Sequence, residues 1–217
     1  MHFIHSGGFM QLIQNRSRLN IRALLNAGLV VATVVLTGCV SPTFYVDTAT
    51  REVPVAELKK PAQPKAVQLL FDFQTKGAPN SRAVSFLKDQ VVDQVKGSGL
   101  FATVDEKPVP GGAVLNVTIN NIPEADAAAK GFKVGLTFGA SGTKVTDNYV
   151  CTVTYLPPDG GKSIVKVSQH AIHTTIGATE VPQNVNKAES VEVAVRTMTR
   201  QIIGTALKDL SLDPTFP

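Results

Sequence analysis

The chain has 217 residues, of which 21 are Lys or Arg and 17 are Asp or Glu, and its formal net charge is +4. A hydrophobic fraction of 43% excludes an intrinsically disordered chain, and 13 Pro and 17 Gly are too few for a collagen-like or low-complexity one. Two Cys are too few for a disulfide framework or a four-thiolate zinc site.

The first segment has the pattern of an export signal. Arg16, Arg18 and Arg22 precede an uncharged apolar run at residues 23–36. This run is shorter than the about 20 residues that a membrane-spanning helix needs. We therefore expect residues 1–38 to be a signal peptide. Met10 begins a more ordinary basic segment than Met1 does, so we take Met10 as a candidate for the true start.

The end of this segment is more specific. Residues 36–39 read Leu-Thr-Gly-Cys, which resembles the lipobox of bacterial lipoproteins. The resemblance implies that the Cys39 thiol receives a diacylglyceryl group and that the signal peptidase cuts between Gly38 and Cys39. It also implies that the new α-amine is acylated, and we expect no cofactor besides these lipids. An ordinary signal, or an anchor helix with a chance cysteine, is the alternative.

The residue after Cys39 and the charge of the mature chain bear on location and partners. The residue after Cys39 is Val40. In enteric-type sorting, a residue other than Asp at this position implies export to the outer membrane. The resemblance therefore implies the outer membrane of a Gram-negative bacterium, with the domain facing the periplasm. Removal of residues 1–38 takes three bases and no acid, which leaves a net charge of +1. Since the chain shows no basic stripe and has no Trp, we expect no nucleic-acid binding.

The mature chain divides into two parts. Residues 39–64 contain four prolines among polar residues and predict a lipidated, extended tether. Tyr45 and Val46 favour the alternative, an ordered edge segment packed on the domain. Residues 65–217 are long enough for one core and predict a single periplasmic domain.

The elements of this domain follow from periodicity. Alternation predicts strands at 67–74 and 149–156. We also expect strands at 100–104 and 114–121, and a returning hairpin strand at 162–175. Residues 79–81, Pro-Asn-Ser, offer a helix start, and the helical spacing of Val84, Leu87, Val91 and Val95 predicts a helix that Gly97 ends. A second helix runs to about Leu210, after a capping signal at residues 186–189.

The expected fold is α+β, with a mainly antiparallel sheet and two amphipathic helices on one face, in the order β-α-β-β-(Gly-rich loop)-β-β-α. This order, with the strings LLFDFQ, GLFATV and GLTFGASG, is similar to the small periplasmic domains of outer-membrane lipoproteins. These include the penicillin-binding-protein activators, the curli secretion lipoprotein and the N-terminal domain of the Tol-system β-propeller protein. The resemblance implies a role in the cell envelope through protein contacts.

Residue types that carry chemistry are few in the mature chain. The string at residues 139–142 lacks the spacing of a nucleophile elbow. His170 and His173, three apart on a strand, point to opposite faces and cannot share a metal, so we expect no metal site and two half-exposed histidines. Cys151 alternates with apolar neighbours and is expected in the core rather than as a redox thiol. We therefore expect no catalytic residues.

The glycine-rich segment is the candidate contact site. Phe132, Val134, Leu136 and Phe138 alternate with Gly, Lys and Thr, and Ser141 ends the run. We consider a hairpin packed on the sheet, a partner-binding or oligomer-forming flap, and a membrane hairpin of a secretion pore, which Lys144 and Asp147 disfavour.

These observations lead to one hypothesis and two alternatives. We expect a non-enzymatic, lipid-anchored envelope lipoprotein that acts as an accessory or assembly factor on another envelope protein. The first alternative is a homo-oligomeric subunit of an export or secretion complex in the outer membrane. The second is an envelope hydrolase, in which a Ser, a His and a carboxylate would converge.

Overall fold

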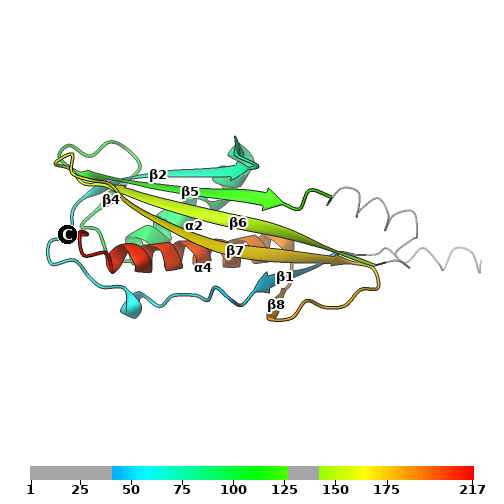
Figure 1. Ribbon diagram of the computed structural model, residues 1–217. Helices are drawn as coiled ribbons and strands as arrows, with labels where there is room; N and C mark the ends of the chain where they lie inside the picture. Colours follow the sequence, from blue (N-terminus) through cyan, green and yellow to red (C-terminus); the bar gives the residue numbers. More distant parts are fainter. Residues whose placement is uncertain (1–40, 127–141) are drawn as a thin grey trace, which may run out of the picture. The chain divides into compact units, whose positions relative to one another are not determined.

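The computed structural model describes residues 41–126 and 142–217. Ser41–Pro217 form one compact unit. Its described part consists of an eight-stranded sheet and two long α-helices (Figure 1). The prediction of an α+β fold with a mainly antiparallel sheet is therefore confirmed.

The sheet is mostly antiparallel with one parallel region. Its strands are β1 (Thr43–Asp47), β2 (Val67–Thr75), β3 (Ala78–Pro79), β4 (Val104–Asp105), β5 (Ala113–Pro123), β6 (Thr143–Leu156), β7 (Ile164–Ile176) and β8 (Val185–Ala188). Their order in space is β3-β2-β5-β6-β7-β1-β8, and β4 also pairs with β2. β2 is parallel to β4 and β5, because helix α2 (Ser81–Gly97) returns the chain to the end where β2 began.

Three short strands, β1, β3 and β8, were not predicted, and the predicted strand at 100–104 is reduced to β4. Leu100 and Phe101 are instead buried in the core. Two apolar residues of the predicted strand are thus core side chains in a loop.

Residues 41–64 belong to the folded unit, unlike the expected tether. β1 lies inside the sheet, paired with β7 on one side and β8 on the other. After the 3₁₀ helix η1 (Val55–Glu57), the Leu58 side chain is in the core and only 8% exposed. The Glu57 carboxylate accepts hydrogen bonds from Arg51 and, at 2.7 Å, from Lys208, and these bonds lower its pKa to about 2. Apolar burial and ion pairs together hold this segment on the domain.

Both helices have side-chain N-caps; the first lies within the helix start predicted at residues 79–81, and the second differs from the predicted position. The Asn80 side chain accepts from the Ala83 amide at the start of α2, and the Ser190 side chain accepts from the Val193 amide at the start of α4 (Val191–Ser211). The predicted capping signal at 186–189 lies mostly in β8. Gly97 is the last residue of α2, and the left-handed residue after that helix is Gly99, with φ of 65°.

The core lies between the sheet and the two helices. Leu69, Leu115 and Val153 on one face of the sheet are buried together with Leu87 of α2 and Ile202 of α4. The helices are also joined by hydrogen bonds from two α2 glutamine side chains to α4 backbone carbonyls. On the other face of the sheet, Leu70, Val165 and Val167 are 42–55% exposed. One face of the sheet is therefore covered and the other is open.

Candidate functional site

The residues predicted for lipidation and partner contact lie outside the described residues. They are Gly38, Cys39, Phe132, Val134, Leu136, Phe138 and Ser141. The structure does show where the described chain meets these two segments. The N-terminal one joins at Ser41, and the glycine-rich one lies between Asp126 and Gly142.

Both junctions are at the same end of the sheet. Thr43, at the start of β1, pairs with Thr175 near the end of β7. Thr143, at the start of β6, pairs with Ile176 at the end of β7. β5 also ends there, since Pro123 pairs with Asp147. We call this the anchor end of the sheet, because the expected lipid anchor precedes β1 (Figure 1).

Gly142 marks a close crossing of two backbones at the anchor end. A Cβ atom at this position would lie 2.0 Å from the carbonyl oxygen of Ala178 and 2.7 Å from the Thr179 amide nitrogen. Contacts below 3.0 Å force the backbone to move. The chain therefore needs glycine here, where the segment before β6 passes the loop between β7 and β8.

Three strands bring a hydroxyl, an imidazole and a carboxylate together near the anchor end. The Thr146 hydroxyl on β6 lies 3.0 Å from Nδ1 of His173 on β7. Nε2 of His173 lies 3.8 Å from a carboxylate oxygen of Asp47, the last residue of β1. The pairing of Thr146 with His173 in the sheet ladder places the first contact, and the pairing of β1 with β7 places the second.

This cluster resembles the group that the hydrolase alternative requires, with Thr in place of Ser. Its geometry differs in two respects. The His173–Asp47 distance exceeds that of a hydrogen bond, so the carboxylate does not orient the ring as in a triad. The Asp47 carboxylate also accepts from the Ala49 amide at 2.7 Å. In this arrangement the three residues join β6, β7 and the end of β1.

The two histidines point to opposite faces of β7, as predicted, but His170 is not half-exposed. It is 6% exposed and packs on the helix side of the sheet. Its Nε2 lies 2.7 Å from the side-chain oxygen of Gln201 on α4, and its Nδ1 accepts from the Ala171 amide. Burial lowers the pKa of His170. The ring is therefore a neutral link between sheet and helix.

Cys151 is a core residue, and this prediction is confirmed. The free thiol is fully buried. Burial raises its pKa to about 12, although a hydrogen bond with Ser168 acts in the opposite direction. A thiol with this pKa is protonated at neutral pH and is a poor nucleophile.

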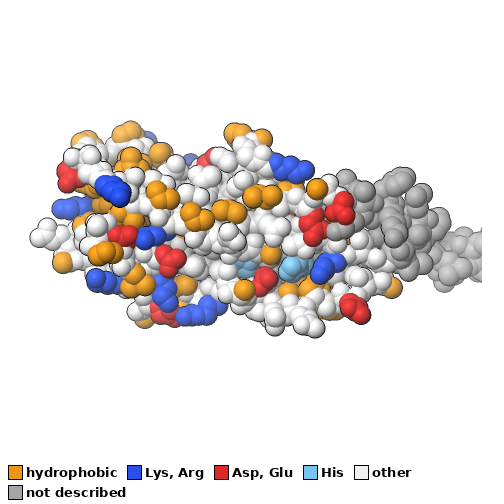
Figure 2. Space-filling view, in the orientation of Figure 1, with side chains coloured by type: hydrophobic (Ala, Val, Ile, Leu, Met, Phe, Trp, Pro, Cys, Tyr) orange, Lys and Arg blue, Asp and Glu red, His pale blue; other side chains and the backbone are white. Residues whose placement is uncertain are grey.

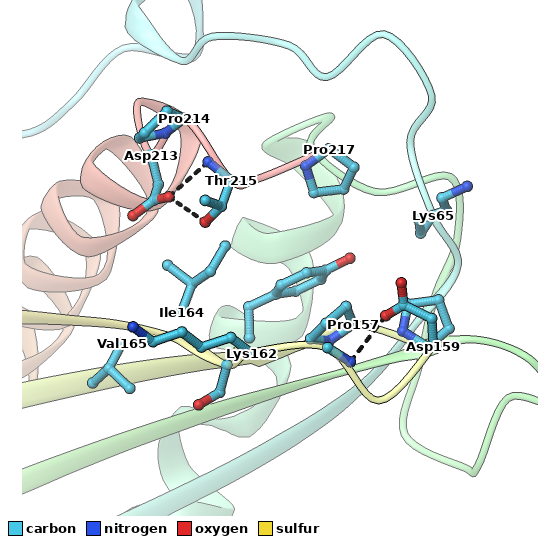
Figure 3. Close-up of a pocket in the computed structure, with 14 residues that line it drawn as sticks. Lys65, Pro157, Asp159, Lys162, Ile164, Val165, Asp213, Pro214, Thr215 and Pro217 are labelled. Atoms are coloured by element: carbon cyan, nitrogen blue, oxygen red, sulfur yellow. Dashed lines mark hydrogen bonds between the residues drawn. The ribbon is translucent and has the colours of Figure 1, made fainter.

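A cleft of about 1040 Å³ lies at the other end of the sheet, around the β6–β7 turn. We call it the distal cleft. Its lining comes from that turn, the start of β7 and the C-terminal segment, and the residues are Lys65, Tyr155, Pro157, Pro158, Asp159, Gly161, Lys162, Ser163, Ile164, Val165, Asp213, Pro214, Thr215 and Pro217. Figure 3 shows Pro157 and Pro217 on opposite sides of the cleft and the Lys65 side chain directed outward.

Two titratable groups of the distal cleft have pKa values shifted away from neutral pH. The Asp213 carboxylate accepts hydrogen bonds from Lys166 at 2.7 Å and from Thr215 at 2.6 Å, and these bonds lower its pKa. Figure 3 shows the contacts between Asp213 and Thr215. The Tyr155 ring packs against Phe101 and Phe216, and burial raises the pKa of its phenol. The Tyr155 hydroxyl has no hydrogen-bond partner in the part of the chain that the structure describes. Proline side chains and the buried Tyr155 therefore line the cleft, and the phenol of Tyr155 is protonated at neutral pH.

Within residues 41–126 and 142–217, no three metal-ligating side chains cluster. Those same residues contain no helix with the length and hydropathy required to span a bilayer. No family model matches the sequence. No curated protein matches it either.

Proposed function

We propose that this chain is an outer-membrane lipoprotein that faces the periplasm, is anchored by acyl chains on Cys39, and acts as a non-enzymatic accessory or assembly factor. Its partner is another envelope protein. The proposal rests on the signal-peptide pattern and the Leu-Thr-Gly-Cys string, together with the position of β1.

The Leu-Thr-Gly-Cys string at residues 36–39 is the observation that carries the proposal, and the position of β1 determines how such an anchor would hold the domain. Thr43 is four residues after Cys39 and is already paired in the sheet. Four extended residues reach about 14 Å. A lipid on Cys39 therefore holds the anchor end of the sheet close to the membrane surface. Two or three acyl chains bind stably, at about 0.8 kcal/mol per buried methylene.

The glycine-rich segment is the proposed contact region within this arrangement. The chain enters it after Asp126 and leaves it at Gly142, at the anchor end. Phe132, Val134, Leu136, Phe138 and Ser141 would then meet a partner near the bilayer, and this favours an integral or membrane-attached partner over a freely diffusing one. Photo-cross-linking in cells from Phe138, followed by identification of the captured protein, tests this part.

The anchor is tested by Cys39→Ser in the full chain, with Cys151→Ser as the control. We expect Cys39→Ser to remain an uncleaved precursor or to appear in a soluble fraction, and to lose the globomycin sensitivity of processing. Cys151→Ser removes the other thiol and should still be processed and sediment with outer membranes. If Cys39→Ser behaves like the control, or if mass spectrometry finds the Cys39 sulfur unmodified in the wild type, the proposal is wrong.

A second candidate function, a subunit of an oligomeric export complex, is favoured by the open face of the sheet. That face is exposed and nearly uncharged, which is typical of surfaces that pack against protein. The oligomeric state of the detergent-extracted full chain separates the two candidates, because an export ring requires several copies in a closed assembly.

A further inference from the structure

The outer edge of β7, on the side of β1, is only partly covered. β7 has 13 residues, and β1 pairs with the four at positions 172–175. Nearer the distal cleft, the Thr50 hydroxyl donates to the Gln169 carbonyl at 2.9 Å. Beyond Thr50 the chain lies against Gly204 of α4. Among the described residues, no strand therefore pairs with this side of β7 at residues 164–168.

Alternate residues of β7 direct their main-chain groups to this edge. In an antiparallel strand the N–H and C=O of one residue point to the same side, and those of the next residue point to the other side. The hydroxyl bond at Gln169 shows that this residue points outward. The pairing of β1 agrees, because the Thr48 amide bonds to Asn184 on the side of β8, so the odd-numbered residues of β1 face β7 and meet its odd-numbered residues. Val165 and Val167 therefore also point outward, and no described residue hydrogen-bonds their N–H and C=O groups on that side.

These unpaired groups have the chemistry that recognises the main chain of an extended peptide. Donors and acceptors alternate at strand spacing, as on sheet edges that accept an added strand. The Val165 and Val167 side chains beside them are 52% and 55% exposed. On the opposite face of β7, Lys166 is paired with Asp213 at 2.7 Å, so it presents no free charge there. An added strand would satisfy the main chain of β7 and cover the two valines.

The same edge leads into the distal cleft, because Val165 also lines that cleft. Lys65 and Lys162 line it as well, and neither forms an ion pair with a carboxylate of the described residues. The aspartates of the lining are already engaged, Asp213 by the β7 lysine and Asp159 by an amide of the β6–β7 turn at 3.1 Å. Figure 2 shows basic and acidic side chains among hydrophobic ones at this end of the molecule, on the left of the view. The two lysines therefore supply cationic groups for an anionic ligand.

We propose that β7 binds the C-terminal segment of another protein as an added antiparallel strand, and that the terminal carboxylate of this segment enters the distal cleft beside Lys65 and Lys162. β7 runs from the cleft toward the anchor end, so an antiparallel strand ends at the cleft. β7 already pairs in this way with both of its neighbours, and antiparallel pairing is more stable per residue than parallel pairing. The carboxylate meets two cationic side chains, and this charge complementarity selects a chain end over an uncharged loop.

The added strand is short and far from the anchor. β1 and Thr50 occupy the edge from Gln169 onward, so about four residues pair with residues 165–168 over about 13 Å. The 13 residues of β7 place the cleft about 40 Å from the anchor end. As a partner site, the edge rests on the proposed accessory role, whereas peptide binding itself requires neither the lipid on Cys39 nor the glycine-rich segment.

The first test uses the detergent-extracted full chain and a fluorescent hexapeptide of alternating threonine and valine with a free C-terminal carboxylate. Fluorescence anisotropy should show saturable binding. The same peptide with a C-terminal amide should bind at least about fivefold more weakly, because it lacks the charge. Two further probes carry N-methyl groups on alternate sets of amides. Methylation of the set that faces β7 should weaken binding at least about tenfold, whereas methylation of the other set should change it by less than about twofold.

The second test changes the protein. Lys65→Gln combined with Lys162→Gln should reduce the affinity for the acid to that for the amide and leave the affinity for the amide unchanged. Lys187→Gln is the control, because it removes an exposed positive charge from β8. Val167→Pro removes an outward N–H, which an edge strand tolerates, and it should lower the affinity about tenfold in a folded protein. If Val167→Pro does not fold, the N-methylated probes test the same hydrogen bonds on the unchanged protein.

Each outcome supports or overturns the strand site. The absence of saturable binding, equal affinities for the acid and the amide, or equal affinities for the two N-methylated probes would overturn it. Repeating the titration with Cys39→Ser separates this proposal from the anchor proposal. Binding by that variant supports the strand site even if the anchor proposal fails, and loss of binding while the anchor is confirmed overturns a site formed by β7 and the distal cleft alone.

Discussion

Leu58 is the residue that best tests whether residues 41–64 belong to the domain. Its side chain is 8% exposed within the core cluster, whereas Val55, three residues earlier, is 48% exposed. Replacing Leu58 by Ala removes three carbon atoms, worth about 2.4 kcal/mol at 0.8 kcal/mol each, and the remaining cavity raises the cost to about 3 kcal/mol. At about 2–4 °C per kcal/mol for a domain of this size, the Tm should fall by about 6–12 °C.

The assay is urea unfolding of the full chain in its membranes, followed by pulse proteolysis. Leu58→Ala should shift the midpoint to lower urea with an unchanged slope, since the slope reflects the surface exposed on unfolding. Val55→Ala, in the same segment, should change the free energy of unfolding by less than about 0.5 kcal/mol. If both variants unfold like the wild type, Leu58 contributes nothing to the core, and a free tether is the better description.

Two further predictions concern Gly142 and His170. Gly142→Ala should destabilise the anchor end, because its Cβ atom would lie 2.0 Å from the Ala178 carbonyl oxygen, and proteolysis at the β7–β8 loop should increase. Gly97→Ala is the control. Its Cβ atom would meet nothing within 4 Å, so this substitution should stabilise the protein by about 0.5–1 kcal/mol. Burial lowers the pKa of His170 in the folded state, so the unfolded chain binds more protons, and stability should fall as the pH drops below about 6.5. His170→Gln should flatten this part of the urea midpoint profile, and an unchanged slope would show that His170 is not its source.

The strands and helices with long alternating or helical patterns could be predicted from the sequence. Strands β2, β5 and β7 lie within about two residues of their expected ranges, and α2 ends at the predicted Gly97. Each of these elements buries one face in the core, so the spacing of its apolar residues in the sequence indicates whether it is a strand or a helix.

Tyr45 and Val46 pointed to an ordered edge segment as the alternative to a tether, but the position of β1 inside the sheet could not be predicted, because it depends on residues far away in the chain. β1 has only five residues, Thr43–Asp47, which are too few to show a clear alternation of apolar and polar side chains. Their partners are Thr175 and Ala188, more than 130 residues later. The same reason applies to the Thr146–His173–Asp47 cluster, which three separate strands assemble. No local signal at Asp47 or Thr146 points to the other two residues.

The position of β1 also determines how a pull on the proposed anchor would act on the domain. β1 hydrogen-bonds to β7 on one side and to β8 on the other, so it is an interior strand. Its N-terminus points to the anchor end, and a pull from Cys39 therefore acts along the strand. Such a pull shears both ladders at once, whereas a pull across an edge strand would break hydrogen bonds one after another. Beyond β1, Thr50 donates to the Gln169 carbonyl and Leu58 is buried, so the chain is fixed again before β2 begins. The proposed lipid anchor would thus be attached to an interior strand, which resists such a pull better than an edge strand does.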